Sequence, residues 1–371
     1  MRPIEKSPRV LLAGVGRWGS NHLRAWQKLG VDLYVAEPAA SQRETCRSAG
    51  VADDHLFADF AQALDLVELV DVVTPVDSHY PIAMTALEAG KDVLVEKPLA
   101  SICREAEELH DRAIALGRIL QVGHIFRYDP ATDFMRAVIA CGELGQIRWL
   151  QARFAGFKRP RNDCGVTAAD ALHFIDLFNF LLGQSPLAVV ACQADLLGRG
   201  MDDMSWVGLE YEQAIGTIEA NYFTPEKDRR VVVVGDTATL VCDFTASDNR
   251  VTVYHNHHVP EAGGWKAIEG SVTRPEIGRA EPLARELAAF LQSCQTRQTP
   301  LADGRSGYEV VRVIEAAQQS AETGQAILLE ERKPHATRAV VQGVHIRRDQ
   351  AEGPRGHRLR TIHPRAQLHR V

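Results

Sequence analysis

Residues 9 to 19 read Arg-Val-Leu-Leu-Ala-Gly-Val-Gly-Arg-Trp-Gly, and this stretch decides the fold of the first part of the chain. Its apolar run, Val10 to Ala13, predicts a short buried strand. A glycine-rich turn follows, and Ser20 to Leu29 then have the pattern of a helix. A strand, a glycine turn and a helix in this order give the GxGxxG pattern its meaning as a dinucleotide-binding signature.

Each glycine of the turn has a separate physical reason. Gly14 would allow the tight turn, Gly16 would let the backbone approach a pyrophosphate, and Gly19 would let helix and strand pack closely. The N-terminus of the helix adds free N–H groups and a partial positive charge, which favour phosphate. A glycine turn that serves packing alone is the alternative.

A carboxylate that follows the second expected strand favours dinucleotide binding. That strand, Asp32 to Ala36, ends at Glu37, which lies about 20 residues after Gly14, as expected of a ribose-binding acid. Because a carboxylate accepts hydrogen bonds from a ribose diol and repels a 2′-phosphate, we expect NAD rather than NADP.

Length and composition limit the class of protein. The chain has 371 residues, 45% of them hydrophobic, so a sizeable core and two domains are expected. A net charge of −6 argues against a nucleic-acid partner. No apolar run approaches the roughly 18–20 residues that span a membrane. Met1 to Pro8 lack a signal-peptide pattern, so a cytoplasmic location is expected. Seven cysteines without a CxxC pair predict free thiols, and we interpret Cys164 as a bystander.

The first 123 residues alternate between strands and helices, which predicts a parallel, doubly wound sheet. Ligands bind such sheets beyond the carboxyl ends of the strands. Candidate cofactor contacts all lie at this edge. The expected strands are Arg9–Ala13, Asp32–Ala36, Val70–Val73, Asp92–Val95 and Leu120–Gly123, and the candidate contacts are Gly14, Gly16, Arg17, Trp18, Gly19, Glu37, Thr74, Pro75, His79, Glu96 and Lys97.

The pattern changes after Ile147. One helix, Ala168–Leu182, precedes several strand candidates with few helices between them, so a large, mostly antiparallel sheet is expected. The helices Leu283–Gln295 and Tyr308–Glu322 are expected to close this second domain. The expected division is therefore 1–123, 124–331 and a basic tail, 332–371.

The tail holds ten Lys or Arg and five His against two acids. It is interpreted either as a solvated segment or as an arm that lies on an acidic neighbouring subunit.

Lys97 is the first candidate for chemistry. It lies between Glu96 and Pro98 at the end of an expected strand, and the proline restrains it to extended geometry. Its ammonium would favour the alkoxide that forms as a hydride leaves a substrate hydroxyl. A surface ion pair between Glu96 and Lys97 is the alternative.

A second cluster lies on the expected helix Ala168–Leu182. Asp170, His173 and Asp176 are three residues apart and share a face. A histidine between two carboxylates is suited to act as a general base, because the acids fix its tautomer and stabilise its charged form. The alternatives are a zinc site and a helix N-cap at Asp170. No metal is expected, because nicotinamide chemistry needs none and no third strong ligand is evident.

Three cations precede that cluster. Lys158, Arg159 and Arg161 suggest an anionic substrate such as a diphosphate, although an ordinary solvated loop explains them as well. His255, His257 and His258 alternate with polar residues, and we interpret them as surface histidines.

Together these motifs resemble the Gfo/Idh/MocA family of NAD(P)-dependent sugar and polyol oxidoreductases, over roughly residues 8 to 330. The most specific mark is Val95-Glu96-Lys97-Pro98-Leu99-Ala100. Others are Gly14-Val-Gly16-Arg-Trp-Gly19-Ser-Asn-His22, Thr74-Pro75-Val-Asp-Ser-His79-Tyr80, Val122-Gly123-His124 and Pro300-Leu-Ala-Asp303-Gly304. The resemblance implies a Rossmann domain followed by an α/β domain with a large open sheet. That sheet commonly forms the interface of homodimers or homotetramers.

Within the family, several stretches are most similar to the UDP-N-acetylglucosamine-type 3-dehydrogenases. They are Arg17-Trp-Gly-Ser-Asn-His22, His79-Tyr80, Gly123-His-Ile-Phe-Arg-Tyr128-Asp-Pro130 and Glu281-Pro-Leu. This implies oxidation of a sugar 3-hydroxyl to a ketone, with substrate contacts from Lys97, Tyr128, Lys158, Arg159, Arg161 and His173. Two alternatives are a dehydrogenase of a free sugar or inositol, and an NAD-binding sensor or scaffold without catalysis.

The chain departs from the family at one position. The family's acid lies four residues before the histidine, where this chain has Ala169, whereas Asp170 lies three before His173. One residue of helix rotates a side chain by about 100°. Either the start of the helix is shifted or Asp170 has another role. Asp176 matches the common pattern.

Overall fold

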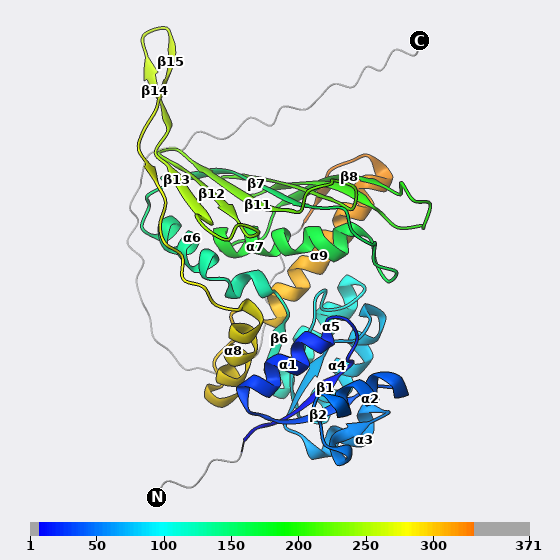
Figure 1. Ribbon diagram of the computed structural model, residues 1–371. Coiled ribbons are helices and arrows are strands. Elements are labelled where there is room, and N and C mark those ends of the chain that lie inside the picture. Colours follow the sequence, from blue (N-terminus) through cyan, green and yellow to red (C-terminus); the bar gives the residue numbers. More distant parts are fainter. Residues whose placement is uncertain (1–6, 330–371) are drawn as a thin grey trace, which may run out of the picture. The chain divides into compact units, whose positions relative to one another are not determined.

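Two sheets with their covering helices make up the part of the chain that the computed structural model describes, residues 7–329 (Figure 1). The basic tail 332–371 lies outside the described residues. Within 7–329, no helix has the length and apolar character needed to cross a bilayer.

The N-terminal sheet has six parallel strands in the order β3-β2-β1-β4-β5-β6. The expected parallel, doubly wound sheet is therefore confirmed, and all five expected strands are present within a residue of their predicted ends. The sequence analysis missed β3, which is only two residues long. The strands are β1 (Arg9–Ala13), β2 (Asp32–Ala36), β3 (Leu56–Phe57), β4 (Leu69–Val72), β5 (Asp92–Val95) and β6 (Leu120–Val122).

Helices cover both faces of this sheet. Val10 and Leu12 pack with side chains of α1, while Leu11 faces the other way, toward α4 and α5. Because both faces are buried, the strands are continuously apolar rather than alternating. The helices are α1 (Gly19–Leu29), α2 (Ala40–Ser48), α3 (Phe60–Ala63), α4 (His79–Glu88) and α5 (Cys103–Leu116), with short 3₁₀ turns η1 (Asp53–His55), η2 (Leu64–Leu66), η3 (Val76–Ser78) and η4 (Ile125–Tyr128).

The second sheet has nine strands in the order β16-β13-β12-β11-β7-β10-β9-β8-β17. Only the β7–β10 pair is parallel, so the expected mostly antiparallel sheet is confirmed. Its strands are β7 (Ile147–Ala155), β8 (Ala188–Ala194), β9 (Met204–Glu210), β10 (Ile215–Asn221), β11 (Asp228–Gly235), β12 (Thr239–Asp243), β13 (Val251–Tyr254), β16 (Val272–Thr273) and β17 (Ile327–Leu328).

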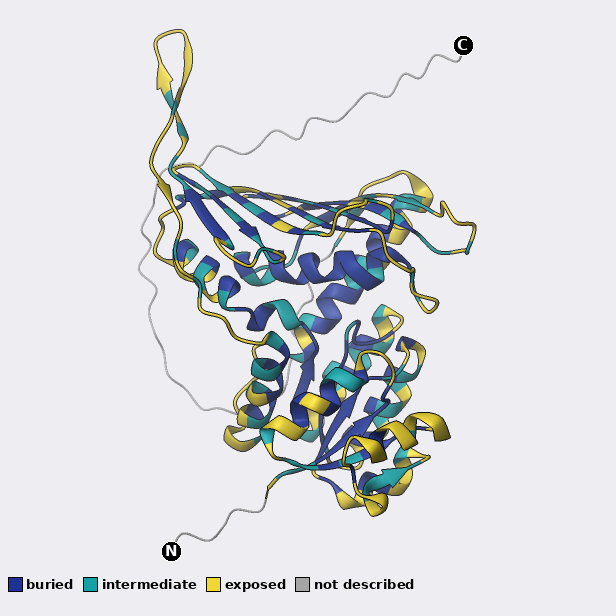
Figure 2. Cartoon of the chain, viewed as in Figure 1, coloured by how far each residue is buried: buried dark blue, intermediate teal, exposed yellow. Residues whose placement is uncertain are grey.

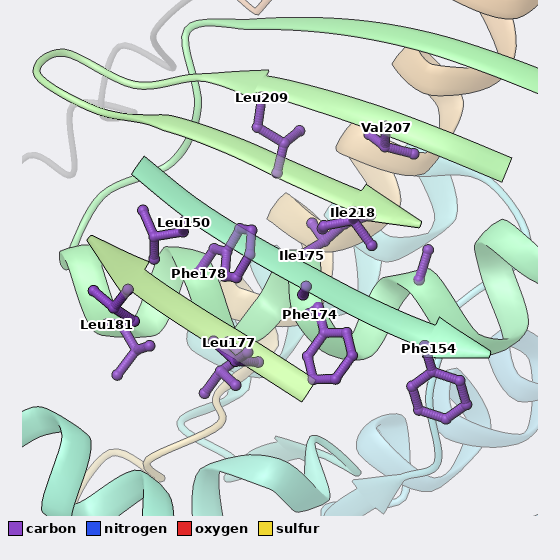
Figure 3. Close-up of a cluster of buried hydrophobic side chains, with 14 of the residues drawn as sticks. Leu150, Phe154, Phe174, Ile175, Leu177, Phe178, Leu181, Val207, Leu209 and Ile218 are labelled. Atoms are coloured by element: carbon purple, nitrogen blue, oxygen red, sulfur yellow. The ribbon is translucent and has the colours of Figure 1, made fainter. Parts of the chain in front are cut away.

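Helices pack on one face of this sheet, where they form the second core. They are α6 (Pro130–Ala140), α7 (Leu172–Leu182) and α9 (Gly304–Thr323). Figure 3 shows Phe174, Ile175 and Phe178 of α7 against Leu209 and Ile218 of the sheet. Eight of the eleven residues of α7 are buried, His173 and Asp176 among them, and the helix is dark in Figure 2. The catalytic candidates on this helix are therefore held by a packed core.

The two late helices are placed differently from our expectation. The apolar face of α8 (Pro282–Thr296) joins the core of the N-terminal sheet through Leu283, Leu287 and Phe290. Helix α9 contributes to both cores: Val311 packs with the N-terminal sheet, and Val310 with the nine-stranded sheet. Neighbouring helix residues point about 100° apart, so one helix serves both.

Strands β14 (His257–Glu261) and β15 (Gly264–Ile268) form a separate hairpin. Figure 2 shows it as an exposed projection beyond the nine-stranded sheet. His258 is exposed, and His255 and His257 are partly exposed, so the expectation of surface histidines is confirmed.

Candidate active site

The glycine turn between β1 and α1 has one open position and two crowded ones. Gly14 has φ +92°, and a Cβ on it would lie 2.8 Å from the carbonyl oxygen of Val73. A Cβ on Gly19 would lie 2.2 Å from the carbonyl oxygen of Gly14, whereas a Cβ on Gly16 would meet nothing within 4 Å. The fold therefore requires glycine at 14 and 19. The open face at Gly16 fits the close approach of a dinucleotide phosphate.

Glu37 fixes the same turn from the end of β2. Its carboxylate accepts hydrogen bonds from the backbone N–H groups of Val15 and Ala39, both at 2.9 Å. Each carboxylate oxygen has a second lone pair, so acceptor sites for a ribose diol remain.

Glu96 lies beneath the turn rather than in an ion pair with Lys97 on the surface. Its Oε1 accepts from the indole N–H of Trp18 at 2.7 Å, and its Oε2 from the backbone N–H of Lys97 at 3.0 Å. The Nε2 atom of His22 lies 3.2 Å from Oε1. The alternative of a surface pair between Glu96 and Lys97 is therefore wrong, because Glu96 is buried.

His22 connects Glu96 to Asp71 of β4. Its Nδ1 lies 2.8 Å from Oδ2 of Asp71, which also accepts from the indole N–H of Trp26 at 2.7 Å. Burial would lower the pKa of His22, but the two carboxylates outweigh it and raise the pKa to about 10. Burial likewise would raise the pKa of Glu96, and the imidazolium of His22 lowers it to about 2. We define this set, His22, Asp71 and Glu96, as the buried charge network.

Sequence reasoning gave no role to His22 or Asp71. The sequence held one signal that could have found them. Asp71 lies in the apolar strand Leu69–Val72, and a carboxylate in a buried strand needs a partner.

His79 is the second support for the end of β5. Its Nδ1 lies 2.8 Å from the carbonyl oxygen of Pro98, and its Nε2 lies 2.9 Å from that of Thr74. The hydroxyl of Ser78 donates to Oγ1 of Thr74 at 2.8 Å. His79 is buried, so it holds the loops after β4 and β5 together and is placed beneath the edge rather than on it.

Lys97 reaches from the end of β5 to the helical segment before His173. Its Nζ donates to the carbonyl oxygen of Ala169 at 2.9 Å. Burial lowers the pKa of Lys97, while Glu96 opposes this effect. The structure thus brings Lys97 and the segment that ends at His173 together.

A π-helical turn, η5 (Thr167–Ala171), contains the displaced acid, Asp170. A π turn is wider than an α turn and changes which side chains share a face. The carboxylate of Asp170 accepts from Nζ of Lys158 at 2.9 Å and does not reach His173. Both of our interpretations are compatible with this geometry: the start of the helix is irregular, and Asp170 pairs with Lys158.

Asp176 also has a partner other than His173. Arg127 of η4 holds it with two guanidinium nitrogens, at 2.6 and 2.9 Å. Neither acid therefore accepts the expected hydrogen bond from His173, whose Nδ1 has no hydrogen-bond partner among the described residues.

His173 is instead fixed by aromatic rings. It stacks on Phe154, with ring centroids 5.4 Å apart and 15° between the planes, and meets the edge of Phe126 at 5.2 Å. Burial lowers the pKa of His173 well below its usual value, and the charges of Lys97, Arg229 and Lys158 lower it further. The imidazole is neutral at neutral pH and can accept a proton.

The expected cations separate into different environments. Lys158 reaches Asp170, while the guanidinium of Arg161 pairs with Asp163 at 2.7 Å and Arg159 is exposed. Sequence reasoning missed Arg229 of β11, whose Cζ lies 3.3 Å from the centroid of Phe154.

Two candidates lie outside this arrangement. Tyr128 is buried, and burial raises its pKa strongly, with Glu286 of α8 as its largest charged neighbour. The expectation that Tyr128 contacts substrate is not supported by this position. Burial raises the pKa of Cys164 to about 11, so its thiol stays protonated. Within residues 7–329, no three His, Cys, Asp or Glu side chains are placed to hold a metal ion.

Comparison with known proteins places the chain. Residues 8–124 match the model of an oxidoreductase family with an NAD-binding Rossmann fold, and residues 136–329 match the C-terminal α/β domain of the same family. UDP-N-acetylglucosamine 3-dehydrogenase of Acidithiobacillus ferrooxidans is 28% identical over 84% of this chain and 95% of its own. Inositol 2-dehydrogenase 1 of Saccharopolyspora erythraea is 25% identical over 87% of this chain and 96% of its own.

A solved structure shares the fold. The WlbA dehydrogenase of Bordetella pertussis, in complex with NADH and UDP-GlcNAcA, superposes with a TM-score of 0.74 at 21% identity over 88% of this chain and 100% of its own. With both family models matched in order, the chain belongs to the Gfo/Idh/MocA oxidoreductase family and carries its NAD-binding Rossmann domain.

Proposed function

We propose that this chain is an NAD-dependent dehydrogenase that oxidises a ring hydroxyl, the 3-hydroxyl, of a nucleotide-linked amino sugar such as UDP-N-acetylglucosamine to a ketone. One observation carries the proposal. Lys97, at the cofactor edge of the N-terminal sheet, meets the helical turn that leads into a neutral, buried His173. An ammonium and an unprotonated imidazole are the two groups that oxidation of an alcohol needs.

The residues for the cofactor lie along the carboxyl edge of the sheet. We assign the phosphates to the turn Gly14 to Gly19 and to the start of α1, and the ribose diol to Glu37. Thr74 and Pro75 complete this edge, and Glu96 and His79 support it from below. When bound, NAD supplies the acceptor for the hydride.

The remaining groups act on the substrate hydroxyl. His173 takes the proton of the O–H group, and the carbon loses its hydrogen with the bonding electrons as the C=O bond forms. Lys97 donates a hydrogen bond to that oxygen and stabilises its developing charge. Asp170 and Asp176 position Lys158 and Arg127 rather than His173, so we assign both acids an indirect role.

The nucleotide-sugar substrate has support from two relatives. One is named a UDP-N-acetylglucosamine 3-dehydrogenase, and the other binds UDP-GlcNAcA beside NADH. A free polyol is the second candidate, because an inositol dehydrogenase is similar over most of its length. The ion pair of Arg161 with Asp163 also reduces the free positive charge that a diphosphate would use.

A non-catalytic NAD-binding role has less support. Its motive was the displaced acid, whereas the hydrogen bond of Lys97 to the turn before His173 supports a catalytic role.

We also propose that the protein is a homo-oligomer formed through the face of the nine-stranded sheet that no helix of the described residues covers, called here the uncovered sheet face. Trp149, Val190, Trp206 and Ile215 are exposed large apolar side chains on its strands. Apolar groups at this density are typical of an interface.

The direct test is NADH formation from purified protein with NAD and either UDP-N-acetylglucosamine or myo-inositol. Turnover of the nucleotide sugar supports the first candidate, and turnover of inositol alone supports the second. The same assay on Lys97→Met protein that still binds NAD tests the assignment of the site.

A further inference from the structure

We propose that Lys158 and Arg229 form an anion subsite beside His173, which binds carboxylate or phosphate oxygens of the substrate. The inference rests on the proposed function only in that the bound molecule is taken to be the sugar substrate. It assigns substrate binding to Arg229, and it assigns anion binding to Lys158 but not to the neighbouring Arg159 and Arg161.

Lys158 is held in place rather than free in solvent. Its Nζ lies 2.7 Å from Oδ2 of Asp170, whose side chain is only 6% exposed. The same nitrogen lies 5.2 Å from the ring centroid of Phe154 and 5.3 Å from that of Tyr222. An ammonium between two aromatic rings and a buried carboxylate is a preorganised charge, and its side chain keeps 39% exposure for a ligand.

Arg229 approaches the site from the other strand of the pair β7–β11. Its guanidinium lies over Phe154, the ring that also stacks on His173. Among the described residues only its Nη1 makes hydrogen bonds, to the carbonyl oxygens of Ala155 and Asp228, both at 2.6 Å. Nε and Nη2 therefore keep their donors, and a guanidinium presents such donors in a fixed plane that suits carboxylate and phosphate.

The charges that act most strongly on His173 are positive. They belong to Lys97, Arg229 and Lys158, while the carboxylates Asp170 and Asp228 act on Arg229. Asp176 is neutralised by Arg127. Because partly buried charges are screened less by solvent than exposed ones, an anionic ligand gains more here than it would at the surface.

This geometry would place the bound anion next to the imidazole ring of His173. Arg161 is paired with Asp163, although its charge still acts on Lys97, and Arg159 is exposed. The subsite lies against Phe154, whose ring centroid is 5.4 Å from that of His173. A carboxylate on the oxidised sugar fits this position, and a sugar-linked phosphate carries the same chemistry.

The test compares three probes that differ in their anions. Calorimetric titration of the NADH-loaded protein would use UDP, UDP-N-acetylglucosamine, and the uronate of that nucleotide sugar, which adds only one carboxylate. We expect wild-type protein to bind the uronate at least tenfold more tightly than UDP-N-acetylglucosamine, whose sugar ring carries no charge. Lys158→Met should abolish this difference, while Lys158→Arg should keep it. Arg230→Met, at an exposed position of β11 next to Arg229, is the control and should also keep it.

The pattern of loss identifies the source of the anion. A loss confined to the uronate assigns the subsite to a sugar carboxylate, and an equal loss for all three probes assigns it to the diphosphate. Arg229→Met leaves the pair of Lys158 with Asp170 intact and should give the same pattern if Lys158→Met is too unstable to titrate.

Unchanged binding of all three probes in both variants would overturn the subsite, as would wild-type protein that binds none of them. The proposed function fails separately: protein that binds the probes but forms no NADH from them retains the subsite and loses the assigned reaction.

Discussion

The Nζ atom of Lys97 and the carbonyl oxygen of Ala169 are 2.9 Å apart, a hydrogen bond that joins the end of β5 to the π turn before His173. Ala169 occupies the position at which the family's acid is expected. The carbonyl oxygen of this residue, rather than a carboxylate, is the partner of the ammonium. A substrate hydroxyl can compete for this neutral acceptor more readily than for a charged one.

Replacement of Lys97 tests its role at that hydroxyl. We expect Lys97→Met to lower kcat about 100- to 1000-fold, the usual loss for one charge-stabilising donor. The dissociation constant of NAD should stay within a few-fold. Lys91→Met is the matched control, because Lys91 also donates to a backbone carbonyl oxygen, that of Val67, away from the site. Stopped-flow measurement of NADH formation would settle this, and equal rates in the two variants would contradict the assignment.

His173 should act as a base down to mildly acidic pH. Its pKa is well below the usual value of about 6.5, so the neutral form persists where an ordinary histidine is protonated. The titratable groups that act on it are Lys97, His124, Arg229 and Lys158. We expect kcat/KM to stay level as pH falls to about 6.5 and to decline only below it.

The corresponding variant is His173→Ala, with an expected loss of about 100- to 10,000-fold in kcat. His258→Ala, on the exposed hairpin, is its control. A wild-type profile that already falls between about pH 7.5 and 6.5 would show that His173 is not shielded as described.

The buried charge network should make stability depend on alkaline pH. The pKa of His22 is about 10 in the folded chain and about 6.5 when unfolded, so its contribution is complete below about pH 6.5. That contribution is lost as pH rises toward 10, by about 1 kcal/mol per pH unit. Glu96 adds no slope in this range, because its pKa is about 2.

Urea unfolding of wild-type protein and of His22→Gln at about pH 6.5, 8 and 9.5 would measure this slope. We expect the wild-type free energy of unfolding to decrease with pH, and the variant to be less stable and nearly insensitive. Parallel curves for the two proteins would mean that His22 is not charged in the native state.

The glycines of the turn give a pair of opposite outcomes. Gly19→Ala should cost about 1–3 kcal/mol of stability, because its Cβ would lie 2.2 Å from the carbonyl oxygen of Gly14. Gly16→Ala should leave stability within about 0.5 kcal/mol, since its Cβ meets no protein atom within 4 Å. It should nevertheless weaken NAD binding about tenfold, which fluorescence titration can measure. Unchanged affinity of Gly16→Ala for NAD would contradict the assignment of a phosphate to this position.

The uncovered sheet face should determine oligomeric state. We expect Trp206→Glu to shift the protein to a smaller species in light scattering coupled to size-exclusion chromatography, because a charge in an apolar interface is costly. Ile114→Glu, at a more exposed apolar position on α5, should not change the mass. A wild-type monomer would contradict the proposal outright.

Local sequence signals were enough for the N-terminal fold. The turn Gly14 to Gly19 and the strand that ends at Glu37 each depend on neighbouring residues, and β1 and β2 have the bounds that the pattern predicts. The covering helices were found by their apolar spacing. The sequence did not show which core each helix joins. The apolar face of α8 predicts that this helix packs against something, but not that it shares a core with Val10 and Leu12.

The partners in the site could not be read from spacing. Asp170, His173 and Asp176 share a face only if the helix is regular, and the π turn breaks that condition. The partners of the two acids come from elsewhere in the chain, Lys158 from the loop after β7 and Arg127 from η4. Sequence reasoning missed Arg229 because it lies at the start of a strand that was predicted from its apolar residues alone.

The central claim is hydride removal from a ring hydroxyl of a nucleotide-linked amino sugar. The most direct measurement is mass spectrometry of UDP-N-acetylglucosamine after incubation with the purified protein and NAD, with a carbonyl trap to draw the oxidation forward. The account predicts a trapped product two hydrogens lighter than the substrate before trapping, which Lys97→Met protein does not form. Untouched substrate, in the presence of protein shown to bind NAD, would contradict it.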